Sequence, residues 1–253
     1  MKTTAMKAAL VAAVLSLLPT TAVKAQSEGG LLLGAELDKK LTRQLSVSVE
    51  GEFRTRNDFK TIDRWSGSVG ASYKFTKWLK ADAGYSLLYG NNREKISYNT
   101  DGSYNNWRPS YWSTRHRLNA SLTADYKFSN NLHLSLRERW QYTYRPESTP
   151  TRWDFDNAKW EDKLRKGKGK NQLRSRLQVE YDKKGATLKP YANVELYHSP
   201  GIEKLRYSVG ADVKLTKRHS LDIYYRFQDQ RNVDESDYDP DMHYLGVGYK
   251  FKF

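Results

Sequence analysis

The segment 112–128 alternates between two kinds of residue along its whole length. Its two interleaved sets are Trp112, Thr114, His116, Leu118, Ala120, Leu122, Ala124, Tyr126 and Phe128, and Ser113, Arg115, Arg117, Asn119, Ser121, Thr123, Asp125 and Lys127. Side chains of a β-strand point to opposite faces in turn, so this strand has one mainly apolar face and one charged face. The pattern recurs about ten times along the chain. It predicts an all-β fold, an antiparallel up-and-down transmembrane β-barrel with a wet, charged interior.

The alternation defines the strands that we expect. They are 31–41, 45–54, 65–75, 79–89, 112–128, 132–144, 173–181, 188–196, 205–215, 221–227 and 244–253. Most of these lengths are close to the about 9–11 residues with which a tilted strand crosses the hydrocarbon layer. Because single-chain bacterial barrels have an even number of strands, this odd count predicts ten or twelve strands, with one segment split or one strand missed.

The connections between these strands alternate in length. Related short turns occupy 40–45, 74–79, 127–132 and 214–221, and a looser copy occupies 181–188. The intervening connections 55–63, 90–110, 146–170 and 231–242 are longer and more polar, whereas 198–204 is short. In the connection 90–110, the pairs 91–92, 101–102 and 105–106 have the Asn, Asp and Gly residues typical of turns. Short turns at one end and long loops at the other are typical of an outer-membrane barrel.

The two ends of the chain predict export to the bacterial outer membrane. Residues 1–25 have a basic start and a short apolar run, which is the pattern of a cleaved secretory signal peptide, so we expect the mature chain to begin at Gln26. Residues 26–253 show no break in composition and predict a single barrel domain. The last strand ends on Phe253, and a terminal aromatic residue resembles the signal that the outer-membrane assembly machinery recognises. The chain has no cysteine, so it forms no disulfide and has no thiolate ligand or thiol nucleophile.

Charge restricts the partners. The formal net charge of +14 falls to +11 when the three lysines of residues 1–25 are removed. The basic residues alternate with apolar ones and are mixed with acids, so they form no continuous basic stripe for nucleic acid. This distribution favours a charged lumen, and loops that face lipopolysaccharide at the surface of the lipid bilayer.

The inward-facing positions are strongly ionic. The residues that we expect to line the lumen are Glu50, Glu52, Arg54, Arg115, Arg117, Arg137, Arg139, Arg174, Arg176, Glu180, Glu195 and Arg226. In a barrel of this size, cross-strand ion pairs that fill the interior are the simpler interpretation. The alternative is a narrow solute path whose arginines favour anions.

A catalytic site has weaker support. Some outer-membrane barrels hydrolyse lipids, and such a site needs a nucleophile, a histidine base and an orienting polar group. The candidates are His198, Ser199 and Glu203 at the rim. No metal-ligand cluster and no phosphate-binding glycine loop occurs in the sequence, so no cofactor is expected.

The short turns and the strand segments 136–140 and 173–177 resemble an uncharacterised family of outer-membrane barrels of Bacteroides-type bacteria. The resemblance implies a membrane barrel and assigns no functional residue. Three interpretations therefore stay open: a structural barrel or narrow solute path, a lipid-modifying hydrolase, and a soluble periplasmic β-protein.

Overall fold

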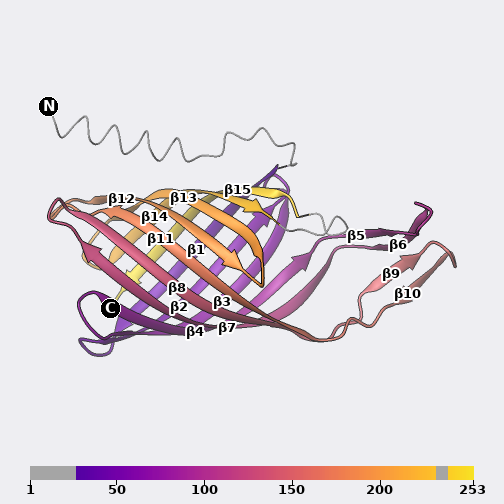
Figure 1. The fold of residues 1–253 in the computed structure, drawn as a ribbon, viewed down its shortest axis with the longest axis horizontal. Coiled ribbons are helices and arrows are strands. Elements are labelled where there is room, and N and C mark those ends of the chain that lie inside the picture. The colour runs from indigo at the N-terminus through magenta and orange to yellow at the C-terminus, as the bar shows by residue number, and fades with distance from the viewer. Residues whose placement is uncertain (1–26, 232–238) are drawn as a thin grey trace.

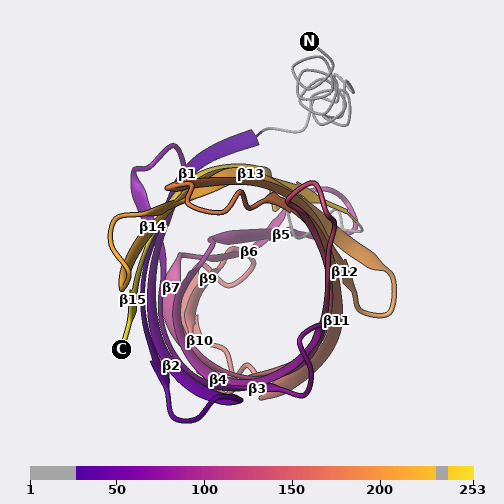
Figure 2. The same cartoon turned by 90° about the vertical axis from the view of Figure 1, so that its left-hand side faces the viewer.

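The computed structural model describes residues 27–231 and 239–253, and the expected signal peptide lies outside these ranges. Eleven strands form one closed barrel. They are β1 (Ser27–Lys40), β2 (Leu45–Arg56), β3 (Thr61–Lys74), β4 (Leu79–Asn92), β7 (Tyr111–Lys127), β8 (Leu132–Arg145), β11 (Lys168–Tyr181), β12 (Leu188–His198), β13 (Ile202–Lys214), β14 (His219–Gln230) and β15 (Asp241–Lys252). Figure 1 shows these strands tilted around a common axis, and Figure 2 shows them from one end as a closed ring. The all-β barrel fold predicted from the alternation is confirmed.

The barrel closes through a parallel pair of strands. β1 pairs with β15 in parallel, from Ser27 opposite Asp241 to Asp38 opposite Lys252, whereas the ten other barrel pairs are antiparallel. The number of strands lies within the range of ten to twelve that we expected, and only the even count was wrong, because a parallel closure allows an odd number. Inside this seam the ammonium group of Lys250 lies 2.5 Å from a carboxylate oxygen of Glu36, its neighbour in register.

Three of the five short turns are closed by a threonine. At the turn that follows β1, the hydroxyl of Thr42 accepts hydrogen bonds from the backbone N–H groups of residues 44 and 45, at 3.2 and 2.9 Å. Thr76 and Thr216 accept the equivalent pairs of bonds in the turns that follow β3 and β13. A side-chain oxygen that accepts hydrogen bonds from nearby backbone N–H groups replaces the inter-strand hydrogen bonds that these groups cannot form in a turn. The repeat in the sequence therefore encodes this turn, and all five predicted short turns lie at one end of the barrel, the short-turn end.

The outer surface is apolar across its middle. Val69, Leu118, Leu136 and Leu245 are about half exposed there, and no second sheet covers them in the described part of the chain. Aromatic residues mark the two margins of this band. Those near the short-turn end are Tyr73, Phe75, Trp78, Tyr126 and Phe128, and those near the opposite end, the long-loop end, are Trp65, Tyr89, Trp140 and Tyr144. Aromatic girdles at this spacing are typical of membrane interfaces.

One charged side chain interrupts this apolar surface. Glu138 points outward from the middle of β8, and the hydroxyl of Ser175 on β11 donates a hydrogen bond of 2.7 Å to its carboxylate. The outward histidines also have partners, because His116 and His243 are hydrogen-bonded to the hydroxyls of Tyr85 and Tyr225. Cross-strand pairing therefore satisfies the polar groups on the outer face.

Two of the long loops form a second sheet beyond the rim. Its strands are β5 (Lys95–Tyr98) and β6 (Tyr104–Arg108) from one loop, and β9 (Thr151–Asp154) and β10 (Lys159–Asp162) from the other. Their order is β10-β9-β6-β5, and Figure 1 shows the sheet projecting from the long-loop end. Of the turn residues expected in 90–110, Asp101 and Gly102 do form a turn. The other two pairs were wrong, because Asn91 and Asn92 end β4 and Asn105 and Asn106 lie within β6.

Candidate functional site: an arginine-lined lumen

The interior of the barrel contains a continuous cavity of about 2570 Å³. Its lining runs from Lys40 and Lys74 at the short-turn end to Asp63 and Arg231 at the long-loop end. The cavity therefore reaches residues near both ends of the barrel. Ion pairs lie along its wall, and the two interpretations from the sequence, an interior filled by ion pairs and a narrow solute path, both stay predictions.

The period of two along each strand places the charged residues in this cavity. All twelve residues that the sequence placed in the lumen line it: Glu50, Glu52, Arg54, Arg115, Arg117, Arg137, Arg139, Arg174, Arg176, Glu180, Glu195 and Arg226. Whether they act on a solute stays a prediction. The cavity is also lined by Tyr197, Lys204 and Tyr244, which were not predicted from the sequence. The alternation could have indicated that they face the lumen. Tyr197, for example, follows the inward-facing Glu195 by two residues and therefore lies on the same face of β12.

Glu195 on β12 is the centre of the largest ionic cluster. Its carboxylate lies 2.6 Å from the guanidinium of Arg137, 2.9 Å from that of Arg174 and 4.0 Å from that of Arg206. The hydroxyl of Tyr197 donates a further hydrogen bond of 2.9 Å to the same carboxylate. Arg174 and Arg206 also lie over the ring of Tyr197, at 4.5 and 4.7 Å from its centroid. One carboxylate and one aromatic ring therefore hold three arginines in fixed positions on the wall.

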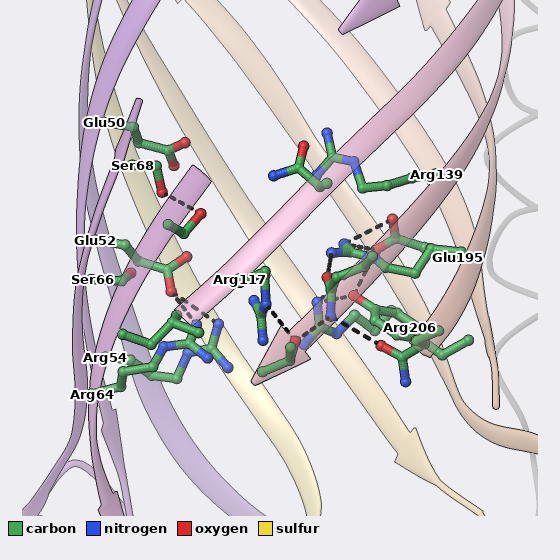
Figure 3. A pocket seen from close by; sticks show the side chains of 18 of the residues that line it. Glu50, Glu52, Arg54, Arg64, Ser66, Ser68, Arg117, Arg139, Glu195 and Arg206 are labelled. Carbon is green, nitrogen blue, oxygen red and sulfur yellow. Dashed lines mark hydrogen bonds and ion pairs between the residues drawn. The ribbon is translucent and has the colours of Figure 1, made fainter. Parts of the chain in front are cut away.

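A second cluster lies across the lumen on β2 and β3. The carboxylate of Glu52 lies 3.1 Å from Arg54 and 2.6 Å from Arg64. Figure 3 shows Glu50 and Glu52 on one side of the cavity, and Arg139 and Arg206 on the other. On the same side as Glu50, the hydroxyl of Ser68 donates a hydrogen bond of 2.9 Å to Ser86. One side of the lumen therefore carries Glu50 and Glu52 together with Arg54 and Arg64, whereas the other side, around Glu195, is mainly basic.

The basic side has more arginines than its carboxylates can neutralise. The arginines that point inward from β7, β8 and β11 are Arg115, Arg117, Arg137, Arg139, Arg145, Arg174 and Arg176. In the described ranges, Arg117, Arg139 and Arg176 have no carboxylate oxygen within the 4.0 Å of an ion pair. Arg117 donates only to the hydroxyl of Thr143, at 3.2 Å. These guanidinium groups keep donors that can bind an anion in the lumen.

Ion pairs also occur where the cavity reaches the short-turn end. Lys189 lies 2.6 Å from a carboxylate oxygen of Asp182, which follows β11. Burial alone would raise the pKa of Asp182, but the hydrogen bond and the positive charge of Lys189 outweigh it and lower that pKa below 3.8. Asp182 is therefore ionised at neutral pH, and it holds the lysine against the wall.

Comparison with known proteins identifies the family. Residues 29–239 match the family described as "Protein of unknown function (DUF2490)". The chain belongs to this family. No protein with a curated description matches the DUF2490 chain in sequence.

Solved structures with a similar fold include outer-membrane proteins. The β domain of the Bordetella autotransporter BrkA has 14% sequence identity and a TM-score of 0.50, over 83% of the DUF2490 chain and 82% of the autotransporter chain. The NanC porin has 14% identity and a TM-score of 0.47, over 89% and 98% of the two chains. At this identity the likeness to the autotransporter domain shows the barrel fold and nothing about activity.

The candidate catalytic residues of this DUF2490 chain do not form a triad. The hydroxyl of Ser199 donates a hydrogen bond of 2.5 Å to the backbone oxygen of Asn171. Glu203 lines the lumen, where the side-chain amide of Gln172 donates to it at 2.6 Å, and His198 is not among the lining residues. No interaction within the described residues links the three candidates, so the geometry does not assemble the site that the sequence suggested.

Among the described residues, no helix is long and apolar enough to cross a bilayer. Nor do His, Asp and Glu side chains in these ranges gather into a group of three that could hold a metal ion.

Proposed function

We propose that the protein is a passive outer-membrane channel that favours anions. The observation that carries the proposal is the continuous cavity, whose basic side holds arginines without a carboxylate partner. The apolar outer band and its aromatic margins support a position in the bilayer, and the asymmetry of the loops favours a periplasmic short-turn end and an external long-loop end. We also propose that a cleaved signal peptide directs the export of a single barrel domain.

The preference for anions follows from the charge on the lumen wall. A solute that crosses the lumen passes Arg117, Arg139 and Arg176, each with free N–H donors and a permanent positive charge. Glu50 and Glu52 lie opposite and prevent the lumen from being uniformly positive. Rings of Arg or Lys side chains favour anions, whereas rings of carboxylates favour cations. We therefore expect moderate selectivity, with an anionic solute oriented toward β7, β8 and β11.

The test is the conductance of the purified barrel in a planar bilayer under a KCl gradient. We expect stable channel openings and a reversal potential that has the sign of the chloride equilibrium potential. Arg117→Gln combined with Arg139→Gln removes two unpaired charges and is expected to move the reversal potential toward the cation side. Arg43→Gln is the matched control, because Arg43 lies in the short turn after β1 and does not line the cavity. A silent bilayer, or a reversal potential of the sign set by potassium, would overturn the proposal.

The proposed location implies further partners. We propose that the external loops contact lipopolysaccharide and that the strand ending at Phe253 is recognised by the outer-membrane assembly machinery, as expected in a Bacteroides-type bacterium. Deletion of Phe253 is expected to lower the amount of folded barrel in the membrane fraction. Extraction of the intact protein by carbonate or high salt would contradict the membrane location and favour a soluble periplasmic protein.

A further inference from the structure

The sheet beyond the rim is a single layer with one aromatic face. Its two hairpins are joined by the β6–β9 pair, where Asn106 lies opposite Asp154 and Trp107 lies opposite Trp153. Ile96 pairs with Trp107, and Trp153 pairs with Trp160, so one row of side chains crosses all four strands. The ring of Trp160 packs on those of Trp107 and Trp153, with centroids 5.7 and 5.5 Å apart.

A second row of rings lies nearer the tip of the sheet. Tyr104 packs between Tyr98 and Phe155, with centroids 5.4 and 5.3 Å apart. Tyr98, Tyr104 and Trp160 keep 59%, 54% and 52% of their surface exposed. In the described ranges no other element pairs with this sheet. Exposed apolar patches of this kind on a polar background are typical of binding surfaces.

Arginines gather where the sheet joins the barrel. The guanidinium of Arg108 lies 5.3 Å from the ring centroid of Tyr111, and a guanidinium nitrogen of Arg165 donates a hydrogen bond of 2.5 Å to the hydroxyl of the same tyrosine. Arg115 and Arg145 are the next inward residues on β7 and β8, and the positive charges of Arg108, Arg115 and Arg165 act on Arg145. We call Arg115, Arg145 and Arg165 the mouth arginines.

The mouth arginines have unused capacity for an anion. Arg115 donates to the side chain of Asn92 at 2.7 Å, and Arg145 donates to the backbone oxygen of Lys166 at 2.9 Å. Within the described residues, Arg115, Arg145 and Arg165 have no carboxylate within ion-pair distance. The buried Nε atom of Arg145 has no hydrogen-bond partner. Positive groups held this close together repel one another unless an anion lies among them.

The edge strand β5 and the mouth arginines line the same cavity. Its lining includes Ile96 and Tyr98 of β5, the three mouth arginines and then the arginines of the lumen. A ligand that lies on the ring of Tyr98 therefore also reaches the anion path that we propose for the channel.

We propose that this surface binds acidic oligosaccharides and presents them to the channel, an inference that rests on the proposed function. Flat sugar rings stack their C–H faces on the negative faces of aromatic rings. Carboxylate groups of the sugar bind guanidinium groups through paired, charge-assisted hydrogen bonds. A neutral glycan would stack on the rings but would bring no negative charge to the mouth arginines. An apolar partner would likewise leave their positive charges without a counter-charge. The combination of rings and arginines therefore favours a sugar chain that carries carboxylates.

The test measures binding of a short oligogalacturonate to the purified full-length barrel in detergent, by calorimetry. A maltooligosaccharide of the same length is the neutral control ligand. We expect the acidic sugar to bind and the neutral one to bind about tenfold more weakly or not at all. Equal affinity for the two sugars, or no binding of either, would overturn the inference.

The variants separate the two halves of the surface. Tyr98→Ala removes an exposed ring at the edge strand, Arg165→Gln removes one mouth charge, and each is expected to weaken binding of oligogalacturonate about tenfold. Trp78→Ala is the matched control, because Trp78 is 57% exposed at the opposite end of the barrel, and its affinity should equal that of the wild type. Binding that survives both Tyr98→Ala and Arg165→Gln would show that the sugar lies elsewhere and would overturn the inference.

Conductance measured with the same sample distinguishes this inference from the proposed function. Anion-selective current that oligogalacturonate neither blocks nor reduces, together with no binding, overturns the inference and leaves the channel intact. Binding in a protein that conducts no ions supports the binding surface and overturns the channel. Capture of a protein instead of a sugar by the aromatic face, with no affinity for oligogalacturonate, also overturns the inference.

Discussion

Gly246 on β15 provides a sharp test of how tightly the lumen wall is packed. It lies opposite Tyr224 of β14, and a Cβ built on Gly246 would fall less than 3.0 Å from three atoms of the Tyr224 ring. The ring has little room to move, because it packs against the buried cluster of Leu32, Met242 and Tyr244. An aromatic ring that covers a glycine is a recurrent device in curved sheets. Gly246→Ala therefore forces a methyl group into space that the ring already fills.

The expected loss of stability can be worked out from these contacts. Overpacking a rigid site by one methyl group costs about 1–3 kcal/mol. Replacing glycine by alanine also restricts the unfolded chain, which returns about 0.4–1 kcal/mol. The net destabilisation is therefore about 1–2 kcal/mol, which is a factor of about 5–30 in the unfolding equilibrium. Urea titration of the barrel in lipid vesicles, followed by tryptophan fluorescence, measures this change as a lower midpoint with an unchanged slope.

Gly51 offers a matched control on the outer face. A Cβ at Gly51 would meet no atom within 4 Å, so Gly51→Ala is expected to leave the midpoint unchanged or to raise it. In a Tyr224→Ala background the methyl group has room, so Gly246→Ala should then cost almost nothing. If Gly246→Ala proved no more destabilising than Gly51→Ala, the inference that the lumen wall is tightly packed at Gly246 would be wrong.

Three further predictions concern charged residues. Glu195→Gln removes the carboxylate that holds three arginines, so we expect it to lower the urea midpoint and to increase the preference for anions in the reversal-potential assay; an unchanged selectivity would contradict this role. Glu138→Leu removes a carboxylate from the lipid-facing surface, so we expect about 1 kcal/mol or more of added stability in vesicles, and a loss would indicate that the carboxylate has a partner in the membrane. Asp182 has a lowered pKa in the folded barrel, so its ion pair with Lys189 stabilises the fold above pH 3.8 and the stabilisation is lost as the pH falls through the folded pKa. Asp182→Asn should therefore lower the midpoint at pH 7 and match the wild type at pH values below the folded pKa, and equal midpoints at both would refute the argument.

The strands could be predicted from the sequence because one face of each strand requires apolar side chains and the other carries polar ones. Lipid outside and water inside give a period of two that persists for ten or more residues, so the segments 112–128 and 132–144 differ from β7 and β8 by about one residue at each end. The period defines the face on which a side chain lies but does not indicate which strands are neighbours. The alternation does not indicate that β1 pairs with β15 in parallel, so the odd number of strands could not be predicted from it.

The candidate site could be predicted in part for the same reason. Alternation placed Glu195 and Arg174 in the lumen, but their ion pair depends on the register between β11 and β12. Tyr197 was missed because an aromatic residue near a strand end suits a membrane girdle equally well. The outer sheet was missed because its strands have only four or five residues, which is too short for a period to emerge.

The parallel seam has a consequence for chain topology. Ser27 and Phe253 lie at opposite ends of the barrel, because β1 and β15 run in the same direction. A segment that joined them would have to span the full height of the barrel, so a short linker cannot produce a circular permutant. Reporter groups fused at the two positions would face different compartments, and labelling them in intact cells would orient the molecule in the membrane.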